Sequence, residues 1–310
     1  MATAAIRLTS TFHAEQGHAA MGNPFADDTT VVALKPNRYE ASIREAWNLR
    51  PLPQGGIVTA LALRAMTDAL DHPEQRLRTL HTTFVAQVAA GPVTIEVELL
   101  RQGRSMSHLR AEVANTGASI GHVTTAVFGS TRPGFAFTDL EPPVGVPLPD
   151  DCPSYRDPPP EDFEFDFEPM PFWDQLVEGR PALGHAPWED YVPGRAERAM
   201  WYRFDDPPYL DDGTLDPLAV VVLADTMPGA VGEKVGPTSD RAWFAPSVDL
   251  TVHLLDHCRS PWVLAHNRAR YAGDGYASAD MALWDCGPDG ADAPRLVAYA
   301  TQLFLFSFAT

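Results

Sequence analysis

Two stretches of the chain would form helices with apolar residues on nearly every side. They span residues 51–66 and 218–228, and proline or glycine marks the start of each run. A helix on a protein surface keeps one polar side, whereas a helix that is apolar all round is enclosed by other structure. The sequence therefore predicts two enclosed helices, at residues 54–70 and 216–233.

The segments around these helices follow the same order in both halves of the chain. Each helix has one strand-like run before it and four after it, with turn residues between the runs, as in an antiparallel meander. The halves are offset by roughly 160 to 170 residues, which indicates a two-fold repeat. The repeat overrides the local strand preference of Val220, Val221 and Val222. The predicted strands are 38–44, 77–87, 93–102, 105–115 and 119–129 in the first half, and 197–204, 247–255, 262–271, 276–285 and 296–308 in the second.

The segment between the halves has a different composition. Ten prolines and many acidic residues fall within residues 138–171, which is typical of a linker. Phe163, Phe165 and Phe167 alternate with acidic residues and would share one face of an extended segment, and residues 172–191 are predicted to be irregular. We therefore expect an N-terminal extension at 1–24, a first repeat at 25–137, a linker at 138–192 and a second repeat at 193–310.

Charge and composition exclude several classes of function. The formal net charge of −18 disfavours binding to nucleic acid or to an anionic membrane, because phosphate contacts need clustered lysine and arginine. Three widely spaced cysteines and no apolar run of membrane-spanning length lead us to expect a cytoplasmic protein. His253, His257 and Cys258 would not share one face of a strand, so we expect no metal site. No phosphate-binding loop or dinucleotide motif points to a cofactor.

One acid, Asp225, lies within the second apolar run. Burying a carboxylate is costly unless it is paired or used in chemistry. Loss of water disfavours the charged form, which raises the pKa of the carboxyl and makes it a stronger base. The alternative is a core aspartate that is simply bonded to its neighbours.

Six short motifs occur along the chain, three in each half. Those of the first half are Gln54-Gly55-Gly56, Leu80-His81-Thr82-Thr83-Phe84 and Arg101-Gln102-Gly103-Arg104-Ser105-Met106-Ser107, and those of the second are Leu223-Ala224-Asp225, Ser247-Val248-Asp249 and Leu296-Val297-Ala298-Tyr299-Ala300-Thr301-Gln302. In this order they resemble the acyl-CoA thioesterases of the double-hotdog type, over about residues 37–129 and 198–306. The resemblance implies an α+β double hotdog, in which two antiparallel sheets each wrap around one long helix and the halves pair into a continuous sheet.

The resemblance also implies a catalytic set. Such enzymes use an aspartate on the second helix, a hydroxyl residue at the start of the next strand and a glutamine on the last strand, which here are Asp225, Ser247 and Gln302. Where the family usually has Asp-His-Ser this chain has Asp249-Leu250-Thr251, so Thr251 is an alternative hydroxyl. Leucine and phenylalanine follow Gln302 in place of the usual Glu-Gly, which implies a more apolar edge of the site.

Three further residues are expected to bind the substrate. Gly55 and Gly56 would begin the first helix, where backbone N–H groups can polarise a carbonyl and glycine permits close approach. His81 begins the next strand, where a lone histidine is more often structural than catalytic. The implied reaction is hydrolysis of acyl-CoA thioesters by a water that Asp225 activates, without metal, cofactor or covalent nucleophile. We also expect a homo-oligomer.

Two other functions compete with this interpretation. Hotdog hydratases and dehydratases resemble one another in carrying an aspartate and a histidine close together before the helix, or a glycine four residues after a histidine. In this chain Phe25 and Ala26, and no histidine, directly follow Asn23-Pro24, and Val85 stands four residues after His81. Both observations disfavour a hydratase or dehydratase. A non-catalytic acyl- or CoA-binding hotdog protein would lack the polar trio, which this chain retains. No Gly-x-Ser-x-Gly motif supports a serine hydrolase.

Overall fold

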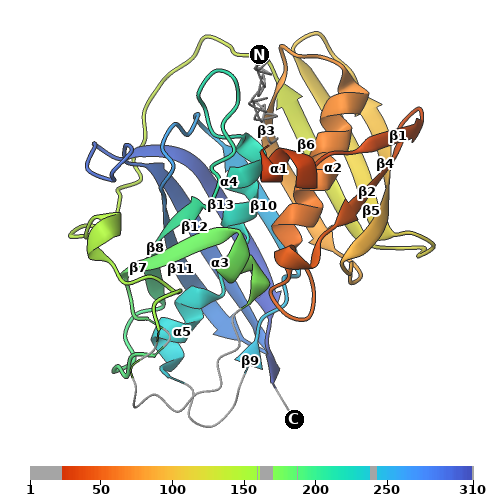
Figure 1. Cartoon of the computed structure of the whole chain (residues 1–310). Helices are drawn as coiled ribbons and strands as arrows, with labels where there is room; N and C mark the ends of the chain where they lie inside the picture. Colours follow the sequence, from red (N-terminus) through yellow and green to blue (C-terminus); the bar gives the residue numbers. More distant parts are fainter. Residues whose placement is uncertain (1–22, 159, 161–169, 187, 238–242, 309–310) are drawn as a thin grey trace, which may run out of the picture.

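One continuous sheet joins the two halves of the chain. The computed structural model describes residues 23–158, 160, 170–186, 188–237 and 243–308. Within them, twelve antiparallel strands pair in the order β1-β2-β4-β5-β6-β3-β10-β13-β12-β11-β8-β7 (Figure 1). The halves pair as expected, through β3 and β10. The two antiparallel sheets of the prediction are therefore parts of a single sheet, because the β3–β10 pairing leaves no sheet edge between the halves.

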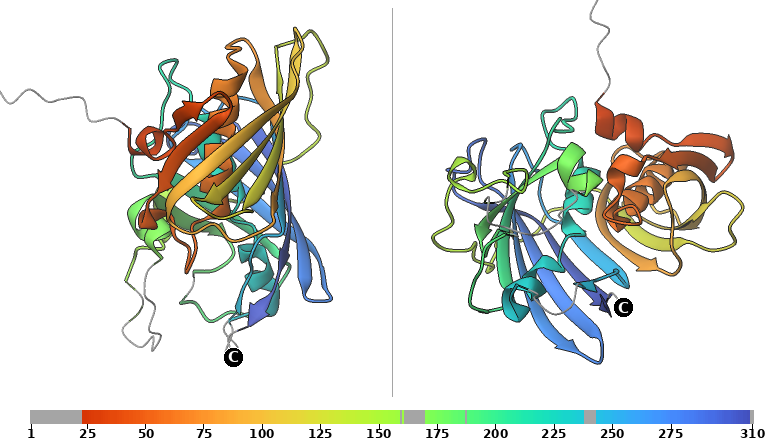
Figure 2. Two further views of the ribbon diagram at one scale, coloured as in Figure 1. Left: turned by 90° about the vertical axis from the view of Figure 1, so that its right-hand side faces the viewer. Right: turned by 60° about the horizontal axis from the view of Figure 1, so that its bottom comes forward.

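The first half follows the predicted order of one strand, one helix and four strands. Its elements are β2 (Arg38–Ile43), α2 (Gly55–Leu70), β3 (Arg76–Phe84), β4 (Gly91–Arg101), β5 (Met106–Asn115) and β6 (His122–Gly129). The strands of this half curl around α2 (Figure 2). Three short elements before the helix were not predicted: α1 (Pro24–Asp28), β1 (Val32–Lys35) and the 3₁₀ turn η1 (Glu45–Trp47).

The second half repeats the arrangement with one difference in its helix. Its elements are β8 (Glu197–Phe204), α4 (Pro217–Ala224), α5 (Gly229–Val235), β10 (Asp249–Leu254), β11 (Val263–Gly273), β12 (Tyr276–Asp285) and β13 (Arg295–Leu305). A small separate sheet pairs β9 (Trp243–Phe244) with β14 (Ser307–Phe308). The strand order 2-4-5-6-3 of the first half matches 8-11-12-13-10 of the second, which is the pattern expected of two repeats related by a pseudo-two-fold axis.

The predicted long helix of the second half is broken. It ends at Ala224, Asp225 is its C-cap, and α5 begins after Pro228. Proline has no N–H to donate and disfavours helical backbone at the residue before it, so the helix cannot continue through Met227. The valines of α4 are helical and buried, because enclosure by the sheet and α2 outweighs their strand propensity.

The segment between the repeats is more ordered than predicted. It contains the 3₁₀ turn η2 (Pro149–Asp151), the helix α3 (Pro171–Gln175) and the strand β7 (Val177–Leu183), which pairs with β8 at one end of the sheet. The prediction of an irregular segment at 172–191 is therefore wrong for α3 and β7. Phe163, Phe165 and Phe167 lie outside the described residues.

The proline-rich part of this segment covers the outer face of the second half. There Trp201, Trp262 and Trp284 form a second apolar cluster with Cys152, and the Trp201 indole N–H donates to the Pro147 carbonyl over 2.9 Å. Burial of large aromatic side chains favours this packing.

The two central helices cross in antiparallel fashion between the repeats. The start of α2 meets the end of α4, where a Cβ on Gly56 would lie 2.8 Å from the Val222 Cα. Further along, the Arg64 guanidinium of α2 binds the carboxylate of Asp216, the N-cap of α4, over 2.7 Å.

Within the described part of the chain, no helix is long and apolar enough to cross a membrane.

Candidate active site

Asp225 lies where the end of α4 meets the start of α2. Asp225 is 6% exposed, and its backbone dihedral angles are no longer those of an α-helix. The residue is therefore a C-cap and not, as predicted, a member of a continuous helix. The glycines that begin α2 come from the other repeat, so the site forms across the boundary between the halves.

Three neutral groups donate hydrogen bonds to the Asp225 carboxylate. The Gly56 backbone N–H donates to Oδ2 over 2.9 Å, and the Ser247 hydroxyl donates to Oδ1 over 3.1 Å. The Gln302 side-chain Nε2 donates to the same Oδ1 and to Ser247 Oγ over 2.8 Å. The structure thus brings together the predicted aspartate, serine and glutamine with both predicted glycines, because Gly55 also lies against the carboxylate.

Burial changes the acidity of this carboxylate. Desolvation raises the pKa of Asp225 from 3.8 to about 6, and the hydrogen bonds from Ser247, Gln302, Gly56 and Gly55 oppose this rise only in part. Each donor is uncharged, so no cation offsets the loss of water. A carboxyl group with a pKa near neutrality can accept and return a proton within one reaction cycle.

The surroundings of the carboxylate leave no space for a side chain at residue 55. A Cβ on Gly55 would lie 2.8 Å from Asp225 Oδ2 and 2.5 Å from a ring carbon of Phe84. Phe84 in turn packs edge-on against His122, with ring centroids 4.8 Å apart. The buried Gln302 Oε1 accepts no hydrogen bond from any residue that the structure describes. An acceptor in this position can orient a donor beside Asp225.

Thr251 and His81 lie together on the opposite face of the sheet. The Thr251 hydroxyl and His81 Nδ1 are 2.9 Å apart, and Thr251 pairs across the sheet with Thr301. Successive residues of a strand point to opposite faces, so the side chains of Thr301 and Gln302 diverge. Of the two candidate hydroxyls, Ser247 is therefore the one that contacts Asp225, and neither Thr251 nor His81 is brought to it.

The sequence assigned no role to Gln54, yet this residue is central to the helix crossing. It is 1% exposed, it caps the start of α2 through Ile57 N, and it donates to two carbonyls at the end of α4. The available signal was a polar side chain directly before Gly55-Gly56, at the start of an enclosed helix.

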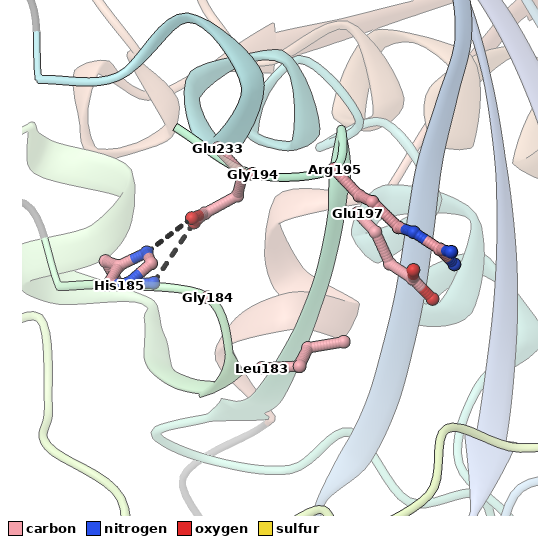
Figure 3. Close-up of a pocket in the computed structure, with 7 residues that line it drawn as sticks. All are labelled: Leu183, Gly184, His185, Gly194, Arg195, Glu197 and Glu233. Carbon is pink, nitrogen blue, oxygen red and sulfur yellow. Dashed lines mark hydrogen bonds and ion pairs between the residues drawn. The ribbon is translucent and has the colours of Figure 1, made fainter. Parts of the chain in front are cut away.

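A surface pocket of about 240 Å³ lies elsewhere, at α5 and β8 (Figure 3). Its buried carboxylate, Glu233, is engaged by the His185 ring over 2.7 Å and by the His185 backbone N–H over 3.1 Å. Arg198 lies 3.5 Å from the same carboxylate. These contacts fix the loop before β8 to α5 and account for the burial of Glu233. None of the residues that line this pocket contacts Asp225.

Comparisons with known proteins agree with the fold and the element order. The chain matches the family model of the acyl-CoA thioesterase N-terminal domain over residues 43–129 and that of the acyl-CoA thioesterase C-terminal domain over residues 149–306. No curated protein sequence matches the chain.

Several solved structures share the fold over nearly their whole length. A conserved protein of unknown function with hot dog fold from Alicyclobacillus acidocaldarius is 25% identical, with 92% of this chain and 98% of that chain covered and a TM-score of 0.72. The acyl-CoA thioesterase II TesB2 of Mycobacterium marinum is 20% identical, with 92% and 99% covered and a TM-score of 0.68. The tesB protein of Mycobacterium avium subs paratuberculosis is 17% identical, with 91% and 98% covered and a TM-score of 0.67.

These likenesses show that the architecture is a hot dog fold of the α+β class. The two family models cover adjacent parts of the chain and include the segments that supply Asp225, Ser247, Gln302 and Gly56. The chain belongs to the acyl-CoA thioesterase family.

Proposed function

We propose that the protein hydrolyses acyl-CoA thioesters to a free acid and CoA, with Asp225 as the base that activates water. The supporting observation is a buried carboxylate held by three neutral donors from both repeats, at the start of a helix. With a pKa of about 6, roughly nine tenths of the carboxyl groups are ionised at pH 7. The group is then present as a base and is stronger than an aspartate in water.

In this proposal, Ser247 and Gln302 orient the attacking water. The water donates one hydrogen bond to the Asp225 carboxylate and the other to Gln302 Oε1. This buried oxygen has no hydrogen-bond donor among the described residues. The Ser247 hydroxyl keeps the carboxylate in place through Oδ1. Orientation of this kind contributes much of the effect of general base catalysis.

Negative charge moves from Asp225 to the substrate during the attack. The water oxygen bonds to the thioester carbon, its proton passes to Asp225, and the carbonyl oxygen becomes an oxyanion. The Gly56 N–H, which donates to the carboxylate in this structure, can then donate to the oxyanion, since the protonated acid attracts it less strongly. The start of α2 stabilises an anion in either position.

Collapse of the oxyanion breaks the carbon–sulfur bond and releases the thiolate of CoA. The proton held by Asp225 returns to the sulfur, which restores the carboxylate. The cycle is thus completed without a covalent bond between the protein and the substrate.

The proposal is tested by following thiol release from acyl-CoA of several chain lengths. We expect turnover by the wild-type protein, and loss of turnover in the variant Asp225→Asn. Asp285→Asn is the matched control, because Asp285 is a buried aspartate bonded to Ser260 and Arg295, away from α2. Binding of acyl-CoA without thiol release by the wild-type protein would instead support a non-catalytic binding protein.

A further inference from the structure

A single side-chain amide, that of Gln54, satisfies backbone groups at the ends of both central helices. Its Oε1 accepts from Ile57 N over 3.0 Å at the start of α2. Its Nε2 donates to the Val222 carbonyl over 2.7 Å and to the Asp225 carbonyl over 3.1 Å, at the end of α4. The terminal N–H and C=O groups of a helix have no partners within it, so one amide supplies partners that each helix lacks.

These contacts fix the backbone of Asp225 from the opposite repeat. Asp225 has left the helical conformation, and only the loop from Thr226 to Pro228 follows it before α5 begins. Its backbone N–H bonds back to Val222 O over 3.2 Å. The bond from Gln54 to the Asp225 carbonyl therefore ties the backbone of this turn to the start of α2. The Gly56 N–H of the same helix binds the Asp225 side chain.

Gly56 provides the space that this arrangement needs. A Cβ at residue 56 would lie 2.8 Å from Gln54 Oε1, 3.0 Å from its Nε2 and 2.8 Å from the Val222 Cα. The amide therefore lies directly beside the glycine, between the two helices. It is almost wholly buried, so water cannot replace the bonds that it makes.

We infer that Gln54 is a positioning residue, which holds the Asp225 carboxylate against the start of α2 without touching the substrate. The inference rests on the proposed role of Asp225 as the base. Replacement of the amide leaves the Asp225 carbonyl without its buried donor and the Val222 carbonyl with only the Asp225 N–H, and the turn moves away from Gly56. A displacement of about 1 Å in a catalytic group lowers turnover by about 100-fold.

The test compares the same substitution at two buried glutamines. Gln54→Glu keeps the acceptor for Ile57 N and removes the donor. Gln75→Glu is the control, because Gln75 is 5% exposed and donates to the Gly103 carbonyl over 2.8 Å, outside the site. We expect Gln54→Glu to lower kcat by about 100-fold with little change in KM, and Gln75→Glu to leave both nearly unchanged. Equal loss of kcat in the two variants, or a change in KM alone, would overturn the inference.

Two further readouts separate positioning from simple loss of stability. In Gln54→Met, which adds no charge, the hydrogen bond from Gly56 to the carboxylate loosens, so the acid limb of the pH–rate profile shifts above pH 6. A double-mutant cycle of Gln54→Met with Asp225→Asn, measured by urea unfolding at pH 7, needs no turnover. We expect the two shifts in unfolding midpoint to be non-additive, and additivity would overturn the inference. Absence of thiol release by the wild-type protein would refute the proposed function but leave this cycle to decide the role of Gln54.

Discussion

The substitution Asp225→Asn should make the protein more stable at neutral pH while it removes activity. In the wild-type protein the folded state binds a proton at this carboxyl more tightly than the unfolded state, because burial raises the pKa. Stability from this group is therefore fully present below about pH 4 and is lost as the pH rises through about 6. Asparagine has no charge to desolvate and so avoids this loss.

The size of the effect follows from the shift in pKa. The rise from 3.8 to about 6 corresponds to about 3 kcal/mol, since one pKa unit equals about 1.4 kcal/mol. About half of this difference has developed by pH 5, and nearly all of it by pH 7. The new amide also fits the site, because its NH₂ group can donate to Ser247 Oγ and to Gln302 Oε1 once the Gln302 amide turns over.

Urea unfolding of both proteins between pH 4 and pH 8 measures this difference. We expect equal stability near pH 4 and an advantage for Asp225→Asn at pH 7, equivalent to a rise in Tm of roughly 5 °C. Asp216→Asn is the control with the opposite sign, because that carboxylate pairs with Arg64 and caps α4, so its loss should destabilise the protein. A variant Asp225→Asn that is less stable than wild type at pH 7, or an advantage that does not change with pH, would refute the reasoning.

Three other predictions concern activity and packing. The proposed role of the ionised Asp225 carboxylate as the base predicts that kcat/KM falls as the pH drops through about 6, by about tenfold between pH 7 and pH 5. A flat pH profile would contradict this role. Ser247→Ala should lower kcat by at least about tenfold, whereas Thr251→Ala should not, because only Ser247 contacts Asp225; equal losses in a thiol-release assay would argue against this. Gly56→Ala should destabilise the protein by about 1–3 kcal/mol, since its Cβ would meet the Val222 backbone. Gly232→Ala, where the added Cβ meets nothing, should be neutral or slightly stabilising in thermal unfolding.

The order of elements could be predicted from the sequence because it depends on local patterns. Apolar enclosure predicted α2, and alternation with regular turns predicted the strands of both halves. The break after Ala224 could not be found in the same way. The repeat argued for one long helix, while Pro228 argued against it, and the proline prevailed because its constraint on the backbone is covalent. The division into repeats at 25–137 and 193–310 stays a prediction.

The candidate site was predictable in its residue types but not in its contacts. Asp225 stood out as an acid in an apolar run, and the family resemblance supplied Ser247 and Gln302. The choice between Ser247 and Thr251 needed the strand register, because a shift of one residue turns a side chain to the other face of the sheet. The role of Gln54 depends on a contact between residues 171 positions apart, which no local pattern records.

The helices α2 and α4 contact each other at two places, one at each end of α4, which we call crossings. Two identical repeats would make these two crossings equivalent and would therefore form two equivalent sites. Here one crossing presents a carboxylate bound only by neutral groups, and at the other the Asp216 carboxylate is matched by the charge of Arg64. The second crossing can therefore hold the repeats together, and the proposed function then assigns one active centre, at the first crossing, to each chain. Titration with a tight-binding thioester analogue should saturate at one equivalent per chain.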